Sequence, residues 1–194
     1  MAIDLKDKKV VSRLAQKAID IPQGVTVEVQ EDSMVVKGPK GSLVQKINPM
    51  VLVEKSESQV QVKPNLSLLK RVSEAKNFRA MTGTFFALIK NMITGVTEGF
   101  SKELRIEGVG YRAQLKEETL SMNLGYAHEV NVEPPEDVSF EVPAQNRIIV
   151  KGISKEVVGQ VAANVRAWRK PLVYGGKGIR YLGEVVHTKE GKKG

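Results

Sequence analysis

Apolar residues alternate with polar ones in several short stretches of the chain, which is the pattern of strands that bury one face. Two stretches share an order of features: three alternating apolar residues, a polar turn, and a short apolar run that ends in Val-Lys-Gly. The alternating residues are Val25, Val27 and Val29 in one stretch and Val138, Phe140 and Val142 in the other. Each stretch, 22–38 and 135–152, therefore predicts a β-hairpin with one buried face.

The likeness of the two hairpins points to an internal repeat. Further strands are expected at Leu43–Ile47, Met50–Glu54 and Val60–Lys63 after the first hairpin, and at Lys102–Glu107, Tyr111–Lys116 and Thr119–Leu124 before the second. A helical pattern follows in each half. The fold class that this order predicts is α+β, with two tandem related domains that each pack an antiparallel or mixed sheet against a helix. Chance similarity of two valine-rich hairpins is the alternative.

The first helix is expected within Ser73–Thr94. Its apolar residues are spaced to line one face, and they are Met81, Phe85, Leu88, Ile89 and Met92. Gly83 interrupts the pattern, which indicates either a close neighbour or a later helix start. The glycines at 95–99 then break the helix and mark the join between the two domains.

The second helix is expected over Lys155–Lys170, with Ser154 as its N-cap and Pro171 as its stop. At about 100° per residue, one face carries Val157, Val161, Val165 and Trp168. The opposite face carries Arg166, Arg169 and Lys170. We therefore expect Trp168 in the core and the three cations toward a partner, with an ordinary solvated helix face as the alternative.

Positive charge is concentrated after this helix. Residues 166–194 hold eight Lys and Arg against two Glu, in a chain of 194 residues with a net charge of +8. Tyrosines and glycines lie among the cations, as suits a phosphate backbone with exposed sugars and bases. The alternative is an unstructured basic tail. The predicted RNA-binding residues are Arg166, Arg169, Lys170, Tyr174, Gly176, Lys177, Gly178, Arg180, Tyr181, Lys189, Lys192 and Lys193.

These patterns give expected boundaries. They are an N-terminal extension and arm at 1–20, a first α+β domain at 21–97, a second at 98–172, and a basic RNA-binding segment at 173–194. Because glycine is flexible and apolar contacts are few there, we expect Tyr174–Tyr181 to become ordered only on a partner.

The residue inventory argues against catalysis. There is no cysteine, and His128 and His187 lie far apart without metal or triad spacing, so no enzyme activity, metal or cofactor is expected. Gly175–Ile179 lacks the Ser or Thr of a phosphate-binding loop, and no small-molecule substrate is expected. Apolar runs are too short to span a membrane and the N-terminus is charged, so a cytoplasmic location is expected.

Several motifs in order resemble the bacterial-type large-subunit ribosomal protein L-six family. They are Ser12-Arg13-Leu14 with Ile19–Val25, Asn91–Phe100, Gly108–Ala113, Val150-Lys151-Gly152 with Val158–Ala163, and Tyr174–Val186. The resemblance covers nearly the whole chain. It implies a duplicated fold and a structural role in the large ribosomal subunit, with large-subunit rRNA bound near the sarcin–ricin loop and stalk base, beside neighbouring ribosomal proteins.

The resemblance also assigns residues. The RNA-facing set that it implies is Arg169, Lys170, Tyr174, Lys177, Arg180 and Lys189. The chain departs from the family at residues 1–10, which precede the usual start, at Phe86, where many relatives have Arg, and at Leu172-Val173, where Glu-Pro is commoner. A free-standing nucleic-acid-binding protein is the rival function, and either a bacterial or an organellar ribosome fits.

Overall fold

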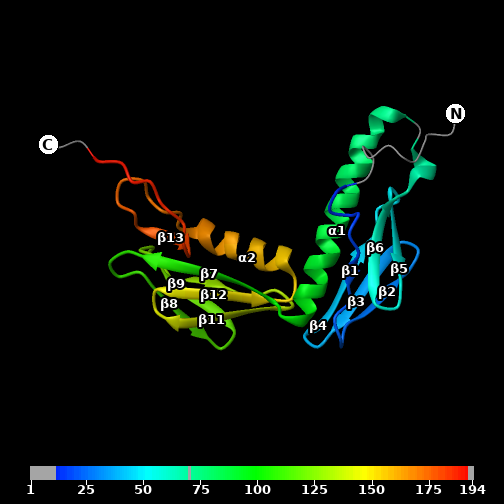
Figure 1. Cartoon of the computed structure of the whole chain (residues 1–194). Helices are drawn as coiled ribbons and strands as arrows, with labels where there is room; N and C mark the ends of the chain where they lie inside the picture. Colours follow the sequence, from blue (N-terminus) through cyan, green and yellow to red (C-terminus); the bar gives the residue numbers. More distant parts are fainter. Residues whose placement is uncertain (1–11, 70, 192–194) are drawn as a thin grey trace. The chain divides into compact units, whose positions relative to one another are not determined.

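The structure is a computed structural model that describes residues 12–69 and 71–191. The chain divides into two compact units, and the boundary between them lies between Glu98 and Gly99 (Figure 1). Over these described residues, each unit has one long α-helix and two small antiparallel sheets. The predicted α+β class with two tandem domains is thereby confirmed.

The first unit contains six strands and the helix α1 (Ala75–Thr97) among its described residues. The strands are β1 (Ile19–Asp20), β2 (Thr26–Val29), β3 (Ser33–Gly38), β4 (Gly41–Lys46), β5 (Val51–Lys55) and β6 (Gln59–Pro64). They form one sheet in the order β1-β6-β5 and another in the order β2-β3-β4. Two short 3-10 turns, Leu66–Leu68 and Val72–Glu74, lead into α1.

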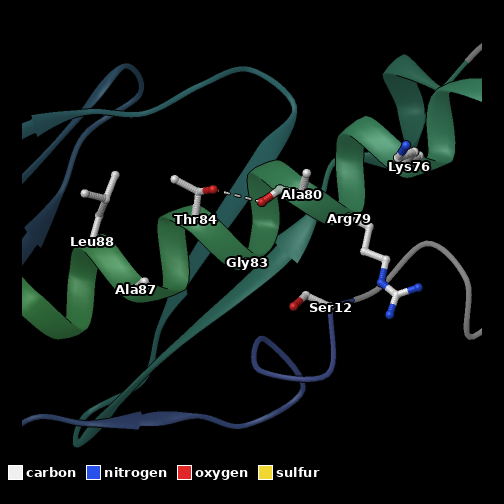
Figure 2. Close-up of a pocket in the computed structure, with 8 residues that line it drawn as sticks. All are labelled: Ser12, Lys76, Arg79, Ala80, Gly83, Thr84, Ala87 and Leu88. Atoms are coloured by element: carbon white, nitrogen blue, oxygen red, sulfur yellow. Dashed lines mark hydrogen bonds between the residues drawn. The ribbon is translucent and has the colours of Figure 1, made fainter. Parts of the chain in front are cut away.

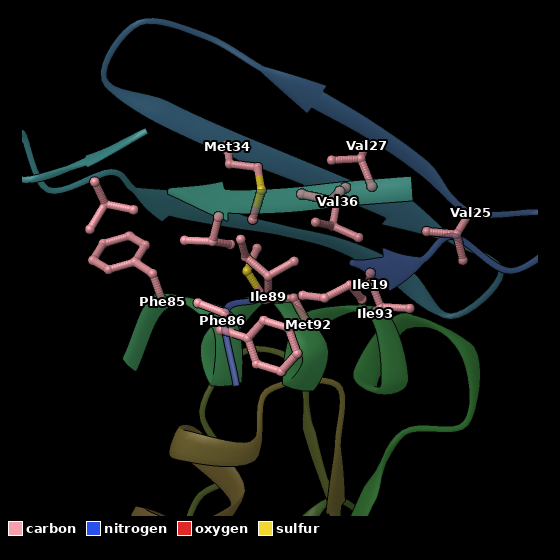
Figure 3. Packing of buried hydrophobic residues seen from close by; sticks show 14 of the residues in the cluster. Ile19, Val25, Val27, Met34, Val36, Phe85, Phe86, Ile89, Met92 and Ile93 are labelled. Carbon is pink, nitrogen blue, oxygen red and sulfur yellow. The ribbon is translucent and has the colours of Figure 1, made fainter. Parts of the chain in front are cut away.

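The core of the first unit lies between α1 and the strands (Figure 3). Phe85, Ile89 and Met92 project from the helix toward Val27 and Val36 of the β2–β3 hairpin. Ala15 and Ile19 also belong to this core, so part of the expected N-terminal arm is folded into the unit. Burial of these apolar side chains is the main force that holds the helix on the sheets.

The second unit contains seven strands and the helix α2 (Lys155–Trp168) among its described residues. The strands are β7 (Phe100–Glu107), β8 (Arg112–Lys116), β9 (Thr119–Asn123), β10 (Val130–Val132), β11 (Val138–Ala144), β12 (Arg147–Gly152) and β13 (Gly178–Tyr181). The sheets have the orders β11-β12-β7-β13 and β10-β9-β8. Helix α2 packs on β7, β12 and β13.

The two units share one topology, but the hairpins compared in the sequence are not equivalent. In each unit a meander (β2-β3-β4 or β8-β9-β10) precedes a hairpin (β5-β6 or β11-β12) that leads to the helix, and the second strand of that hairpin pairs with the first strand of the unit. The predicted repeat matched β2–β3 with β11–β12, whereas topology matches β5–β6 with β11–β12. Alternating valines misled the comparison because any half-buried strand carries them.

Most expected elements are present, with strand ends within two residues of the prediction. Helix α1 runs through Gly95 to Thr97, and Gly99, at a positive φ of 80°, follows its C-cap. Gly83 has a close neighbour, since a Cβ there would lie 3.0 Å from Ser12 Oγ. The short strands β1, β10 and β13 were not predicted.

The prediction that Trp168 is a core residue is wrong. Helix α2 starts at its Ser154 cap as expected, but its buried stripe runs through Val158, Val161, Ala162 and Val165. These residues follow the i, i+3, i+4, i+7 spacing of a single helix face. Trp168, the last residue of the helix, lies beside that stripe and is 48% exposed. The first-turn residue Val157 is also exposed.

Candidate nucleic-acid interface

The chain beyond α2 folds back onto the second unit. Strand β13 pairs antiparallel with β7, and Ile179 opposite Ile106 is fully buried. The N–H of Ile179 donates a hydrogen bond of 2.7 Å to the carbonyl of Arg169. The expectation that Tyr174–Tyr181 is unordered without a partner is therefore wrong for Gly178–Tyr181, because the open edge of β7 and a core site for Ile179 order this strand within the protein.

We call residues 169–191 the C-terminal loop (Figure 1, orange to red). Backbone hydrogen bonds join its two arms: Leu172 N–H donates to the carbonyl of Lys177 at 2.9 Å, and Lys189 N–H donates to the carbonyl of Val173, also at 2.9 Å. The N–H of Gly176 closes the turn by donating to the carbonyl of Leu172. Gly176 has a φ of 65°, which glycine adopts readily. These hydrogen bonds give the projecting loop a defined backbone conformation.

Three lysines of this loop are exposed: Lys170, Lys177 and Lys189. Within residues 12–69 and 71–191 none of them forms an ion pair, and Tyr174, which lies between them, is 72% exposed. The backbone hydrogen bonds above tie Lys177 and Lys189 to one projection, and Lys170 directly precedes its hydrogen-bonded arms in the chain. These four of the predicted residues are available to an anionic partner without breaking an internal contact.

Other predicted residues make contacts inside the protein. Arg166 pairs with Glu184, and Arg180 pairs with Glu107. Arg180 also lies opposite Arg105 in the sheet, so Glu107 offsets a repulsion between like charges. Tyr181 packs on the core, with Lys102 and Arg166 at 5.7 and 5.4 Å from its ring centre.

Glu184 joins α2 to the turn after β13 through its carboxylate. Its carboxylate accepts from the guanidinium of Arg166 and from the backbone N–H of Tyr181, the latter at 2.9 Å. These two contacts, that of Arg166 first, lower the pKa of Glu184 below its ordinary value. Glu184 therefore stays ionised at neutral pH and fixes the turn that follows β13.

Gly178 has a structural requirement of its own. Its φ is 143°, and a Cβ there would lie 2.7 Å from the carbonyl oxygen of Lys170. The end of α2 and the start of β13 approach so closely that a side chain does not fit. The glycine therefore serves the fold, whereas sequence reasoning assigned it to close approach by RNA.

Arg169 connects three loops. Its guanidinium lies 5.2 Å from the ring centre of Tyr126, and its Nε donates to the hydroxyl of Tyr111 at 3.3 Å. These contacts, with Tyr126 first, raise the pKa of Arg169. Tyr111 and Tyr126 were not predicted as site residues. The signal for Tyr111 was the glycine-rich stretch Gly108–Gly110 before it, since a Cβ at Gly108 would lie 2.9 Å from the Tyr111 ring.

The first unit carries a separate groove on α1, with a volume of about 700 Å³. Small side chains line it along the helix, Ser12 faces Gly83, and Lys76 and Arg79 lie at one end (Figure 2). Phe86, where the family resemblance leads one to expect Arg, is 9% exposed and belongs to the hydrophobic cluster of the unit. Its side chain is therefore not available to a partner.

Lys192 and Lys193, also predicted to bind RNA, lie outside the described residues. Within the described part of the chain, no group of three or more His, Asp or Glu side chains is arranged to hold a metal ion. No helix of that part is long and apolar enough to cross a membrane.

Comparison with known proteins agrees with the duplicated fold. The family model described as Ribosomal protein L6 matches twice, at residues 21–99 and 107–182. The large ribosomal subunit protein uL6 of Thermosipho melanesiensis and that of Thermotoga maritima are each 57% identical over 183 residues, covering 94% of this chain and all of the relative. The uL6 protein of Fervidobacterium nodosum is 52% identical over the same length. The chain therefore belongs to the ribosomal protein L6 family, whose members are structural and non-enzymatic components of the ribosome.

Proposed function

We propose that this protein is a structural constituent of the large ribosomal subunit, which it joins by binding rRNA through the C-terminal loop of its second unit. The observation that carries the proposal is the loop itself: Lys170, Lys177 and Lys189 are exposed on a projection that internal hydrogen bonds hold in place. The relatives' description as large ribosomal subunit proteins supports the same assignment.

The mode of binding is neutralisation of phosphates together with recognition of RNA shape. Each lysine that meets a phosphate releases a condensed counterion, which favours binding without reading sequence. Tyr174 and Gly176 lie at the tip of the loop, where a ring can contact a sugar or base and a bare backbone can approach a phosphate. A pre-ordered loop loses less conformational entropy on binding than a flexible tail.

The remaining predicted residues support this loop. Arg166, Gly178, Arg180 and Tyr181 fix β13 and the turns beside it, and thereby position the lysines. Lys192 and Lys193 extend the positive charge along the chain. As part of this proposal, the bound rRNA lies near the sarcin–ricin loop and the stalk base, among neighbouring ribosomal proteins, in a cytoplasmic ribosome, as the family resemblance of the sequence implies.

Sedimentation of subunits tests the proposal. The tagged protein is expressed in a bacterial host, and large subunits are pelleted through a cushion at about 0.5 M salt, where isolated surface contacts are strongly screened. A subunit constituent stays with the large subunit in a constant ratio. A free-standing nucleic-acid-binding protein washes off into the supernatant, and that result would refute the proposal.

A further inference from the structure

We propose that the indole of Trp168 is a stacking site for an unpaired RNA base, next to the C-terminal loop. The inference rests on the proposed function and adds to it a contact with bases, because the lysines alone recognise only the backbone. Trp168 is the single tryptophan of the chain, and it is the half-exposed final residue of α2. Its indole N–H has no hydrogen-bond partner among the described residues.

The backbone of Trp168, from which this exposed ring projects, is held by a hydrogen bond to a neighbouring loop. The hydroxyl of Tyr126, in the loop between β9 and β10, donates a hydrogen bond of 2.6 Å to the carbonyl of Trp168. Arg169 then lies over the Tyr126 ring and donates to Tyr111. A helix end that would otherwise fray is thus held by two loops.

The glycines around Tyr111 show how closely this support is packed. A Cβ at Gly108 would lie 2.9 Å from the Tyr111 ring, and one at Gly125 would lie 3.1 Å from it. Both glycines have positive φ, at 149° and 77°. The ring of Tyr111 therefore fits between two backbones, which fixes the hydroxyl that Arg169 contacts.

The chemistry around the ring favours RNA. Arg169 and Lys170 follow Trp168 directly in the chain, so the C-terminal end of α2 carries positive charge that attracts phosphates. Aromatic side chains next to cations stack on bases with little preference for sequence, because every base has a π face. Bases inside a duplex are already stacked, so the ligand class is an unpaired, bulged or terminal nucleotide.

Fluorescence tests the site directly, because the emission of the whole chain comes mainly from Trp168. The full-length protein is titrated at low salt with a mixed-sequence single-stranded RNA of about 12 nucleotides, with its duplex, and with inorganic polyphosphate of similar charge. Stacking predicts strong quenching by the single strand and little change with polyphosphate at saturation. Equal quenching by polyphosphate, or none by the single strand, would overturn the inference.

Variants separate stacking from charge. Trp168→Ala should weaken binding of the single strand by about 5-fold to about 150-fold, while Trp168→Phe should keep most of the affinity. The matched control is Val157→Ala, which removes an exposed apolar side chain from the other end of the same helix. Thermal melts confirm that each variant is folded.

The outcomes distinguish the two proposals. If Trp168→Ala binds the single strand like the wild type while loss of the three lysines abolishes binding, the stacking site is refuted and the proposed function stands. If Val157→Ala weakens binding as much as Trp168→Ala, the weaker binding comes from a general change in the helix and not from a lost stacking contact. The stacking site is then likewise refuted. If neither the lysines nor Trp168 affect RNA binding, both proposals fail.

Discussion

Arg166 in α2 holds Glu184 in the turn after β13 through two hydrogen bonds, one of them 3.1 Å between Nε and Oε2. Both side chains are three-quarters buried, with 26% of each exposed. The pair joins the helix to the returning chain, and Glu184 also accepts from the N–H of Tyr181. Arg166, which the sequence analysis predicted to bind RNA, therefore holds the C-terminal loop against α2. We call the Arg166–Glu184 ion pair the clamp of this loop.

The clamp predicts a pH dependence of stability. The pKa of Glu184 is lowered in the folded protein from an ordinary value of 4.5, chiefly by Arg166. Its contribution is therefore complete above about pH 4.5 and is lost as the pH falls through the lowered pKa. Glu184→Gln should lose about 1 kcal/mol of stability at pH 7, and this difference from the wild type should shrink below pH 4.5. Thermal melts across pH 3 to 7 measure it, and a difference that grows toward acid pH would contradict the clamp.

The close approach of Lys170 to Gly178 predicts a cost for any side chain at that glycine. Gly178→Ala should lower stability by about 2 kcal/mol or more, because the new Cβ meets a backbone oxygen and the φ is unfavourable. The matched control is Gly175→Ala in the same loop, where no atom lies within 4 Å and φ is not positive. Chemical denaturation compares the two, and equal stabilities would refute the assignment.

The two sides of α2 predict different responses to truncation. Val165 is fully buried, so Val165→Ala should cost about 2 kcal/mol. Trp168→Ala should cost less than about 1 kcal/mol despite the larger side chain, because the ring is half exposed. Denaturant midpoints of both variants provide the comparison. A larger loss of stability in Trp168→Ala than in Val165→Ala would show that the tryptophan is a core residue.

Strand β13 predicts slow amide exchange in the free protein. The N–H of Ile179 is buried and hydrogen-bonded, whereas Tyr174 is exposed at the tip of the loop. Ile179 should exchange about 100-fold more slowly than Tyr174 without RNA. Hydrogen exchange followed by NMR resolves the two amides, and similar rates would mean that the strand forms only on a partner.

The sequence predicted most of the fold because its signals are local. Alternation identified the two hairpins, and a cap with a stop identified α2. It missed β13 because Gly178–Tyr181 contains no alternation long enough to recognise, and its partner β7 is distant in the chain. It also grouped Arg166 and Arg180 with the free lysines, because the ion pairs with Glu184 and Glu107 depend on tertiary structure.

The central claim is that Lys170, Lys177 and Lys189 bind rRNA phosphates. The most direct measurement is the salt dependence of affinity for a large-subunit rRNA fragment, for the wild type, a variant with these three lysines changed to Gln, and a control with Lys46, Lys55 and Lys90 changed to Gln. The control lysines are exposed on the first unit and form no ion pair among the described residues. The claim predicts that the slope of log affinity against log salt falls in magnitude by about 2 to 3 in the loop variant and by less than about 1 in the control. Equal slopes for the two variants would contradict it.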